Sequence, residues 1–320
     1  RNRMSAEGAL ARVRGRGLRI LTFNVWFSEY AFSRRMEAIA AMVEALLPDV
    51  ACLQEVVPAA QELFSKRKDL AEHYDMSPFP VGSYGCMMLA RKDLACTFSQ
   101  HPFPSEMGRS LLCARTNAMP GGELVICTAH LESLNTRPVR LEQLKISAGV
   151  MAPLPDAIMC GDFNFCSYRN FSGRGSLENN DMCRVLRHYV DCWPAIRGTE
   201  RGYTFDSEWN DNIRQREQMR YDRIVYRGAR FRPARIELLG TEPVETYLGG
   251  SGGGSSGGGC GSGGVHATLH GHVGKVPPPP AAVDARARPR GLPAPSARAG
   301  PGAPVPAAPA PPVVPLPVRV

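Results

Sequence analysis

The stretch AIMCGDFN, residues 157–164, indicates how this chain folds, because an apolar run ends there in two polar side chains. A short apolar run of this kind is typical of a buried strand. In a strand, the two-residue spacing of Asp162 and Asn164 points both side chains to one face. A carboxylate can bind a divalent cation, and an amide can hold a phosphate oxygen or a water molecule. An isolated Asp-x-Asn is more often a simple turn.

Two earlier segments also end an apolar run with a polar residue. TFN ends at Asn24, and DVACLQE ends at Glu55. A single buried carboxylate is costly unless it is paired or bound to a metal. The simpler interpretations are a salt bridge at a strand end for Glu55 and a cap or turn for Asn24.

Two further polar residues stand in apolar surroundings. His130 follows ELVICTA and could hydrogen-bond a phosphate oxygen, although a lone histidine is more often structural. Asp222 lies early in the apolar segment YDRIVY. It could orient a histidine, or it could form a salt bridge with Arg220 or Arg223.

Hydrophobic periodicity predicts alternating strands and helices as far as about Leu248. Apolar residues recur every three or four positions in 33–47 and in 140–151, which predicts two amphipathic helices. Apolar runs predict strands at 18–25, 49–56, 123–131, 157–164, 220–228 and 235–244. Buried strands that alternate with helices predict an α/β sandwich of packed sheets, with the polar residues at the strand ends.

The composition changes abruptly after Leu248. Residues 249–264 are rich in Gly and Ser, which predicts a flexible insert. The apolar fragment VHATLHGHVG follows, and the Pro/Ala-rich segment 273–320 is expected to be disordered. We therefore expect a basic flexible segment at 1–17, one domain at 18–272 interrupted by the insert, and a disordered tail.

Charge and cysteine usage restrict the class of protein. The net charge is +8, with an excess of basic residues near both ends of the chain, which could favour encounters with a polyanion or be ordinary solvated charge. Ten cysteines without a regular spacing suit a reducing compartment. No apolar run is long enough to span a membrane, so we expect no membrane association.

Taken together, TFN, LQE, HLES, GDFN and YDRIVY occur in an order that resembles the endonuclease/exonuclease/phosphatase superfamily. That resemblance implies a four-layer α/β sandwich with Mg²⁺ at one end, with Mn²⁺ as an alternative. Several blocks look like the tyrosyl-DNA phosphodiesterase 2 branch of the superfamily: PFPSEMGRSLLCA, TAHLES, the helix start at Arg140, and YTFDSEWNDN. The resemblance then implies hydrolysis of a 5′-phosphotyrosyl bond between DNA and a trapped topoisomerase.

The resemblance also implies roles for individual residues. Glu55 would hold the metal with Asn24 beside it, Asp162 would activate or orient the attacking water, and Asn164 would hold the phosphate. His130 would stabilise the transition state, and Asp222 would orient a catalytic histidine. Substrate contacts would come from Ser133 and Phe205. The partner would be DNA with a 5′-tyrosyl-linked protein adduct, bound by a monomer in the nucleus, with an organelle as the alternative compartment.

The chain departs from the family pattern at three places. Cys166 stands where relatives often have an arginine, and Phe205 replaces a tryptophan. The Ser-Asp-His motif before the last strand is missing. Either GVHATL is that strand and the histidine position falls at Ser262, which we favour, or His266 takes the role after Val265.

Two hypotheses follow from the missing motif. The chain is an active phosphodiesterase in which His266, His270 or His272 replaces the missing group, or it is a catalytically impaired member that acts by binding. The core motifs are shared by apurinic endonucleases, deadenylases, inositol phosphatases and neutral sphingomyelinases. Because of the HLES and YTFDSEWN blocks, we rank these enzymes below the tyrosyl-DNA phosphodiesterase branch.

Overall fold

The structure is a computed structural model that describes residues 12–13, 17–79, 83–119, 121–173, 175–248 and 264–271. Most of the predicted N-terminal segment 1–17 lies outside these residues. So do residues 249–263 of the Gly/Ser-rich stretch and the segment 272–320. The domain limits expected from composition therefore stay predictions.

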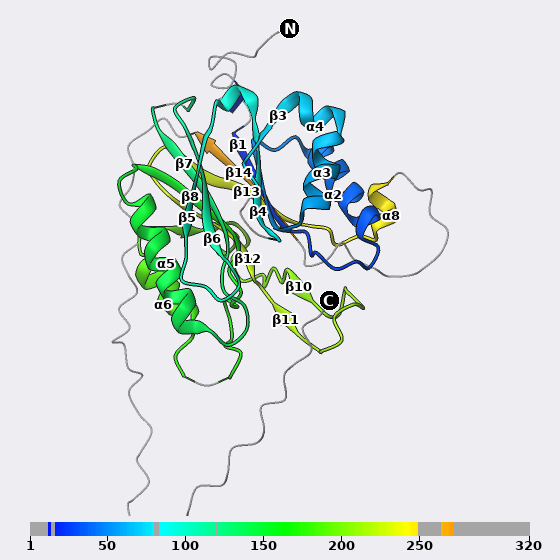
Figure 1. The fold of residues 1–320 in the computed structure, drawn as a ribbon. Coiled ribbons are helices and arrows are strands. Elements are labelled where there is room, and N and C mark those ends of the chain that lie inside the picture. The colour runs from blue at the N-terminus through cyan, green and yellow to red at the C-terminus, as the bar shows by residue number, and fades with distance from the viewer. Residues whose placement is uncertain are drawn as a thin grey trace, which may run out of the picture. The chain divides into compact units, whose positions relative to one another are not determined.

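One six-stranded sheet contains both the beginning and the end of the described chain (Figure 1). Its order is β13-β14-β1-β2-β4-β3, and β1 and β2 run parallel. The strand predicted around GVHATL is confirmed as β14, which pairs antiparallel with β1 and β13. The strands are β1 (Leu18–Asn24), β2 (Val50–Val56), β3 (Tyr74–Met76), β4 (Gly85–Arg91), β13 (Phe231–Leu239) and β14 (Gly264–Gly271).

The second six-stranded sheet has the order β5-β6-β7-β8-β12-β9, and its central pair β7 and β8 is also parallel. A separate hairpin pairs β10 with β11. The strands are β5 (Thr97–Pro102), β6 (Ser110–Thr116), β7 (Leu124–His130), β8 (Asp156–Asp162), β9 (Val190–Asp191), β10 (Phe205–Asp206), β11 (Gln218–Met219) and β12 (Asp222–Arg227).

The two sheets pack face to face through a shared apolar core. Inward side chains of the first sheet, such as Ile20 and Cys52, belong to one buried cluster with Ile126, Ile158 and Ile224 of the second. Strand alternation assigns every second residue to this inner face. The inner rows end in polar residues where β1, β2, β7 and β8 end, so both sheets bring polar groups to the same edge.

Helices cover the outer face of each sheet, which gives the four-layer α/β sandwich. Outer residues of the first sheet, such as Leu21 and Leu53, pack on Met36 and Phe64, and those of the second, such as Cys127, pack on Leu144. None of the helices in the described residues is long and apolar enough to cross a bilayer. The helices are α2 (Phe32–Leu46), α3 (Pro58–Lys66), α4 (Lys68–His73), η1 (Lys92–Leu94), α5 (Arg137–Met151), α6 (Asn179–Val185), α7 (Cys192–Arg197) and α8 (Val244–Tyr247).

The predicted elements agree with the observed ones except near their ends. Helix α5 begins three residues before the predicted Arg140, because Pro138 is compatible with the first turn of a helix. Strand β8 ends at Asp162, whereas a strand to Asn164 was expected. Asn164 instead has φ of 53°, in the left-handed region that asparagine tolerates in turns.

Candidate active site

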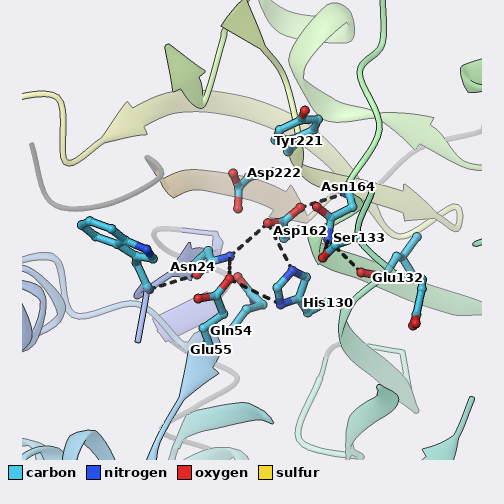
Figure 2. Close-up of polar contacts among 12 residues, drawn as sticks. Asn24, Gln54, Glu55, His130, Glu132, Ser133, Asp162, Asn164, Tyr221 and Asp222 are labelled. Atoms are coloured by element: carbon cyan, nitrogen blue, oxygen red, sulfur yellow. Dashed lines mark hydrogen bonds and ion pairs between the residues drawn. The ribbon is translucent and has the colours of Figure 1, made fainter. Parts of the chain in front are cut away.

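Polar side chains from both sheets converge where the parallel strand pairs end. Asn24 of β1 is the backbone partner of Gln54, and His130 of β7 is the partner of Asp162. Asp222, at the start of β12, is the backbone partner of Asp162. Figure 2 shows these groups pointing into one space. The resulting cluster comprises Asn24, Gln54, Glu55, His130, Asp162 and Asp222.

The amide of Asn24 connects the two sheets. Its Nδ2 donates to Glu55 Oε1 and to Asp162 Oδ2, both at 3.0 Å. Its Oδ1 accepts the backbone N–H of Trp26 at 3.0 Å, so the amide donors must face the carboxylates. The sequence-predicted residues Asn24, Glu55 and Asp162 therefore share one hydrogen-bonded unit.

Asp162 is buried and Glu55 is partly buried, and the two carboxylates are close enough to repel each other. Burial raises the pKa of Glu55, and the charge of Asp162 adds to this, whereas the hydrogen bond from Asn24 lowers it. Burial likewise raises the pKa of Asp162, against the lowering hydrogen bonds from Asn24 and from the Asn164 N–H. A bound cation would offset both the burial and the repulsion.

His130 is neutral in this site. Burial lowers its pKa well below the ordinary value, and the positive charge of Arg109 lowers it further. Arg109 lies 2.7 Å from His130 Nδ1, and because a guanidinium only donates, Nδ1 is an acceptor and the ring proton is on Nε2. That nitrogen faces Asp162 Oδ2 at 3.6 Å.

Asn164 and Ser133 form the edge of the site next to His130. Asn164 Nδ2 donates to Leu131 O at 2.8 Å and to Ser133 Oγ at 3.1 Å. The prediction that Asp162 and Asn164 lie on one strand face is wrong, because the chain turns after Asp162. Asp162 Oδ1 accepts the backbone N–H of Asn164 at 2.8 Å, which is the turn that an Asp-x-Asn sequence often forms.

Asp222 is fully buried, and its carboxylate oxygens have no hydrogen-bond partner among the described residues. Burial raises its pKa well above the ordinary value, and the charge of Asp162 acts in the same direction, while the Thr204 hydroxyl nearby lowers it. The salt-bridge alternatives do not apply: Arg220 pairs with Asp191, and Arg223 binds Asn179 and a backbone carbonyl. Asp222 is therefore a buried acid beside the site without a cationic partner among the described residues.

The structure does not bring His266 to this cluster. Its backbone pairs with Leu21 and Glu237, and it shares the outer face of the sheet with Leu21. Asn24 lies three residues from Leu21 on β1 and therefore points to the opposite face. His266 is 2 % exposed, and its Nδ1 lies 3.2 Å from Glu237 Oε1.

The other two candidates for the missing histidine are also away from the site or outside the described residues. Gly264, at the start of β14, pairs with Phe23, the neighbour of Asn24, so this end of β14 is near the site. The backbone of His270 lies six residues further along β14, where it pairs with Arg232. His272 and Ser262 lie outside the described residues.

Phe205 lies in an aromatic cluster beside the polar site. Its ring centroid is 5.6 Å from that of Tyr221, and Phe171 stacks on Tyr221 at 6.2 Å with an angle of 24° between the rings. Cys166 is buried in the same cluster. Phe171 is 40 % exposed, so one aromatic ring of this cluster is open to solvent.

Two residues of the site were not predicted from the sequence. Gln54 Nε2 donates to Thr22 Oγ1 at 3.1 Å and to Thr128 Oγ1 at 3.0 Å, which connects the sheets directly beneath the site. Arg109 contacts His130 and Ser133 and lies 5.1 Å from the Tyr84 ring centroid. In the sequence, only its place in the block EMGRSLL could have marked Arg109 as a site residue, because its contact partners are distant along the chain.

Known proteins share both the sequence pattern and the fold. The model of the "Endonuclease/Exonuclease/phosphatase family" matches residues 21–262. Tyrosyl-DNA phosphodiesterase 2 of Xenopus laevis is 31 % identical over 239 residues, which is 70 % of this chain and 61 % of that protein. This chain therefore spans less than two thirds of the length of that relative.

Solved structures give the same result for the fold. D. rerio TDP2 "complexed with single strand DNA product" superposes with a TM-score of 0.65 at 24 % identity, covering 79 % of this chain and 98 % of that one. Truncated Caenorhabditis elegans TDP2 also gives 0.65, at 21 % identity over 81 % of this chain and 99 % of that one. With two packed sheets, helices on both outer faces and a family match over most of its length, this chain belongs to the endonuclease/exonuclease/phosphatase family.

Proposed function

We propose that the protein is a metal-dependent phosphodiesterase that hydrolyses 5′-phosphotyrosyl bonds in DNA. The observation that carries this proposal is the unit formed by Glu55, Asn24 and Asp162 beside a neutral His130. Such a unit suits attack by water on a phosphodiester. The names of the most similar relatives support tyrosyl-DNA as the substrate.

The residues present fit a divalent cation of the Mg²⁺ class. Asp162 is a buried carboxylate and Glu55 a partly buried one, and their repulsion is offset only in part by the Asn24 amide. The described residues contain no group of three or more His, Cys, Asp or Glu arranged as a metal cluster. Mg²⁺ does not need one, because it usually keeps several waters and takes one or two carboxylates. Glu55 would hold the ion with Asn24 beside it, and Mn²⁺ suits the same oxygen donors.

The chain's own groups account for the remaining roles. A bound cation supplies positive charge that stabilises the charge developing on the phosphoryl oxygens. Asp162 accepts the proton of the attacking water, and burial moves its pKa towards the range useful for that role. His130 keeps its proton and donates a hydrogen bond from Nε2–H to a phosphoryl oxygen, and Asn164 holds another. Phe205, which is partly exposed beside the buried Tyr221, offers an aromatic ring on which a base of a single strand can stack.

A second candidate function is binding with slow or no turnover. Residues 249–263, which precede β14, contain no histidine, and His266 lies on the outer face of the sheet. Asp222, which would orient a catalytic histidine, has unpartnered carboxylate oxygens among the described residues. An enzyme without this group would lose part of its stabilisation of the transition state while keeping the means to bind DNA.

One experiment separates the two candidates. We would measure Mg²⁺-dependent release of tyrosine from a 5′-tyrosyl single-stranded oligonucleotide by wild type, Asp162→Asn and Asp162→Ala. Release by wild type that falls at least about 100-fold in both variants supports the enzyme. Equal rates in all three proteins contradict it. No release by wild type, together with retained binding of the oligonucleotide, supports the second candidate.

A further inference from the structure

A buried arginine organises the loop that connects β1 to α2. Arg35 is the fourth residue of α2 and is 1 % exposed. Its Nη1 donates to Val25 O and to Trp26 O, both at 2.7 Å, and its Nε donates to Tyr30 O at 2.9 Å. The guanidinium also donates to the Ser28 carbonyl and lies 4.7 Å from the Trp26 ring centroid.

The same loop supplies backbone donors to the active site. The N–H of Trp26 donates to Asn24 Oδ1 at 3.0 Å, and the N–H of Phe27 donates to Glu55 Oε2 at 3.3 Å. The first bond determines which way the Asn24 amide points, and the second holds the carboxylate oxygen that Asn24 does not reach. Both side chains therefore depend on where the loop places two peptide groups.

The loop conformation is one that the chain would not adopt readily by itself. Trp26, in the loop, has φ of 55°, and Glu55, in strand β2 that the loop contacts, has φ of 59°. The left-handed region is uncommon for residues with large side chains, so surrounding contacts must hold it. Arg35 Nη1 binds the carbonyls of Val25 and Trp26, which belong to the same peptide groups as the N–H groups of Trp26 and Phe27.

We propose that Arg35 is a positioning residue that sets the orientation of Asn24 and Glu55, and thereby the affinity of the site for a divalent cation. This inference rests on the proposed function. Arg35 acts through the loop, not by contact with substrate. Residues that orient metal ligands typically change metal affinity by about 10- to 100-fold when they are replaced.

The second sheet contains an equivalent arginine that serves as a matched comparison. Arg140 is the fourth residue of α5, which follows β7 as α2 follows β1. Its Nη1 donates to Glu132 O at 2.8 Å and to Leu134 O at 2.7 Å, and its Nε and Nη2 bind Glu178. The loop that it holds carries Ser133, on the Asn164 side of the site and not on the Glu55 side.

The test compares Arg35→Lys with Arg140→Lys, because lysine keeps the charge and loses the multiple donors. Arg34→Met is the neutral control, since Arg34 is exposed and, within the part of the chain that the structure describes, pairs with Glu245 at the surface. Mn²⁺ binding is measured by electron paramagnetic resonance on the full chain without DNA. Thermal unfolding is measured on the same samples, and hydrolysis is then followed as a function of Mg²⁺ and of substrate.

We expect Arg35→Lys to bind Mn²⁺ about tenfold more weakly and to need correspondingly more Mg²⁺. Arg140→Lys should raise KM for the oligonucleotide while its Mn²⁺ affinity stays near that of wild type, and Arg34→Met should match wild type in both. Unchanged Mn²⁺ affinity in folded Arg35→Lys overturns the inference. So does an equal loss of Mn²⁺ affinity in Arg35→Lys and Arg140→Lys, because it indicates a general structural effect.

If Arg35→Lys does not fold, Trp26→Leu carries the test, because it removes only the ring that the guanidinium contacts at a partly exposed position. A weaker Mn²⁺ affinity in that variant, with a normal unfolding temperature, supports the inference, and an unchanged affinity overturns it. Wild type that binds Mn²⁺ but does not cleave tyrosyl-DNA counts against the proposed function alone. Wild type that binds no Mn²⁺ counts against both.

Discussion

The guanidinium of Arg109 lies 2.7 Å from Nδ1 of His130. The two side chains share this hydrogen bond directly, in the middle of the site, and no carboxylate lies between them. This contact requires an uncharged imidazole, because two positive charges at that distance would repel each other. It also assigns the single ring proton to Nε2, the nitrogen on the side of Asp162.

We predict that His130 is neutral in wild type at neutral pH and that Arg109→Gln raises its pKa. Burial and the charge of Arg109 both lower the pKa, so removing the charge reverses only part of the shift. Nuclear magnetic resonance titration of the His130 ring in both proteins measures the pKa. A wild-type His130 that titrates near the ordinary histidine value of about 6.5 would contradict the prediction.

Asp222→Asn should stabilise the protein at neutral pH. Burial raises the pKa of Asp222 in the folded state, whereas the unfolded chain ionises at about 3.9. Folding therefore retains a proton that the unfolded state releases, and the stability of wild type falls as the pH rises from about 4 to the folded pKa. Asparagine does not ionise, so the variant does not lose stability in this way as the pH rises.

The gain in free energy of unfolding should be about 1–3 kcal/mol at pH 7.5 and close to zero at pH 4. Urea unfolding of both proteins at the two pH values measures it. A variant that is less stable than wild type at pH 7.5 would show that the Asp222 carboxylate has a favourable partner in the intact chain.

His266→Leu should leave hydrolysis unchanged. The histidine lies on the outer face in the row of Leu21, and its Nε2 is buried without a partner among the described residues. Leucine removes that cost and also the contact with Glu237, so the free energy of unfolding should change by about 1 kcal/mol or less. Loss of activity without loss of stability would instead support His266 as the replacement for the missing catalytic histidine.

Phe205→Ala should weaken binding of single-stranded DNA, whereas Phe205→Trp should retain it. The stacking of one base on an aromatic side chain is worth about 1–3 kcal/mol, or roughly 5- to 150-fold in affinity. Fluorescence anisotropy with the Asp162→Asn protein avoids cleavage during the measurement. Equal affinities for the alanine and tryptophan variants would remove Phe205 from the DNA-binding surface.

Much of the fold could be read from local patterns. Helix α2 and strands β1, β2 and β7 lie within one or two residues of their predicted ranges, because apolar periodicity depends only on neighbours along the chain. Asn24, Glu55, His130 and Asp162 were identifiable because each ends an apolar run. The tight turn at Asn164 was not, since an Asp-x-Asn sequence is compatible with both a strand end and a turn.

The remaining features depend on contacts between residues that are far apart in sequence. Arg109 and Arg35 each contact site elements through partners that no local pattern identifies. The face on which His266 lies follows from the register of β14 against β1, and a shift of one residue would have turned it inward. Local hydrophobic patterns thus placed the carboxylates and the amide at strand ends. Only the packing of the two sheets decided that one Asn24 amide joins them, and that Asp222 lies buried beside the site with no histidine of the described residues bound to it.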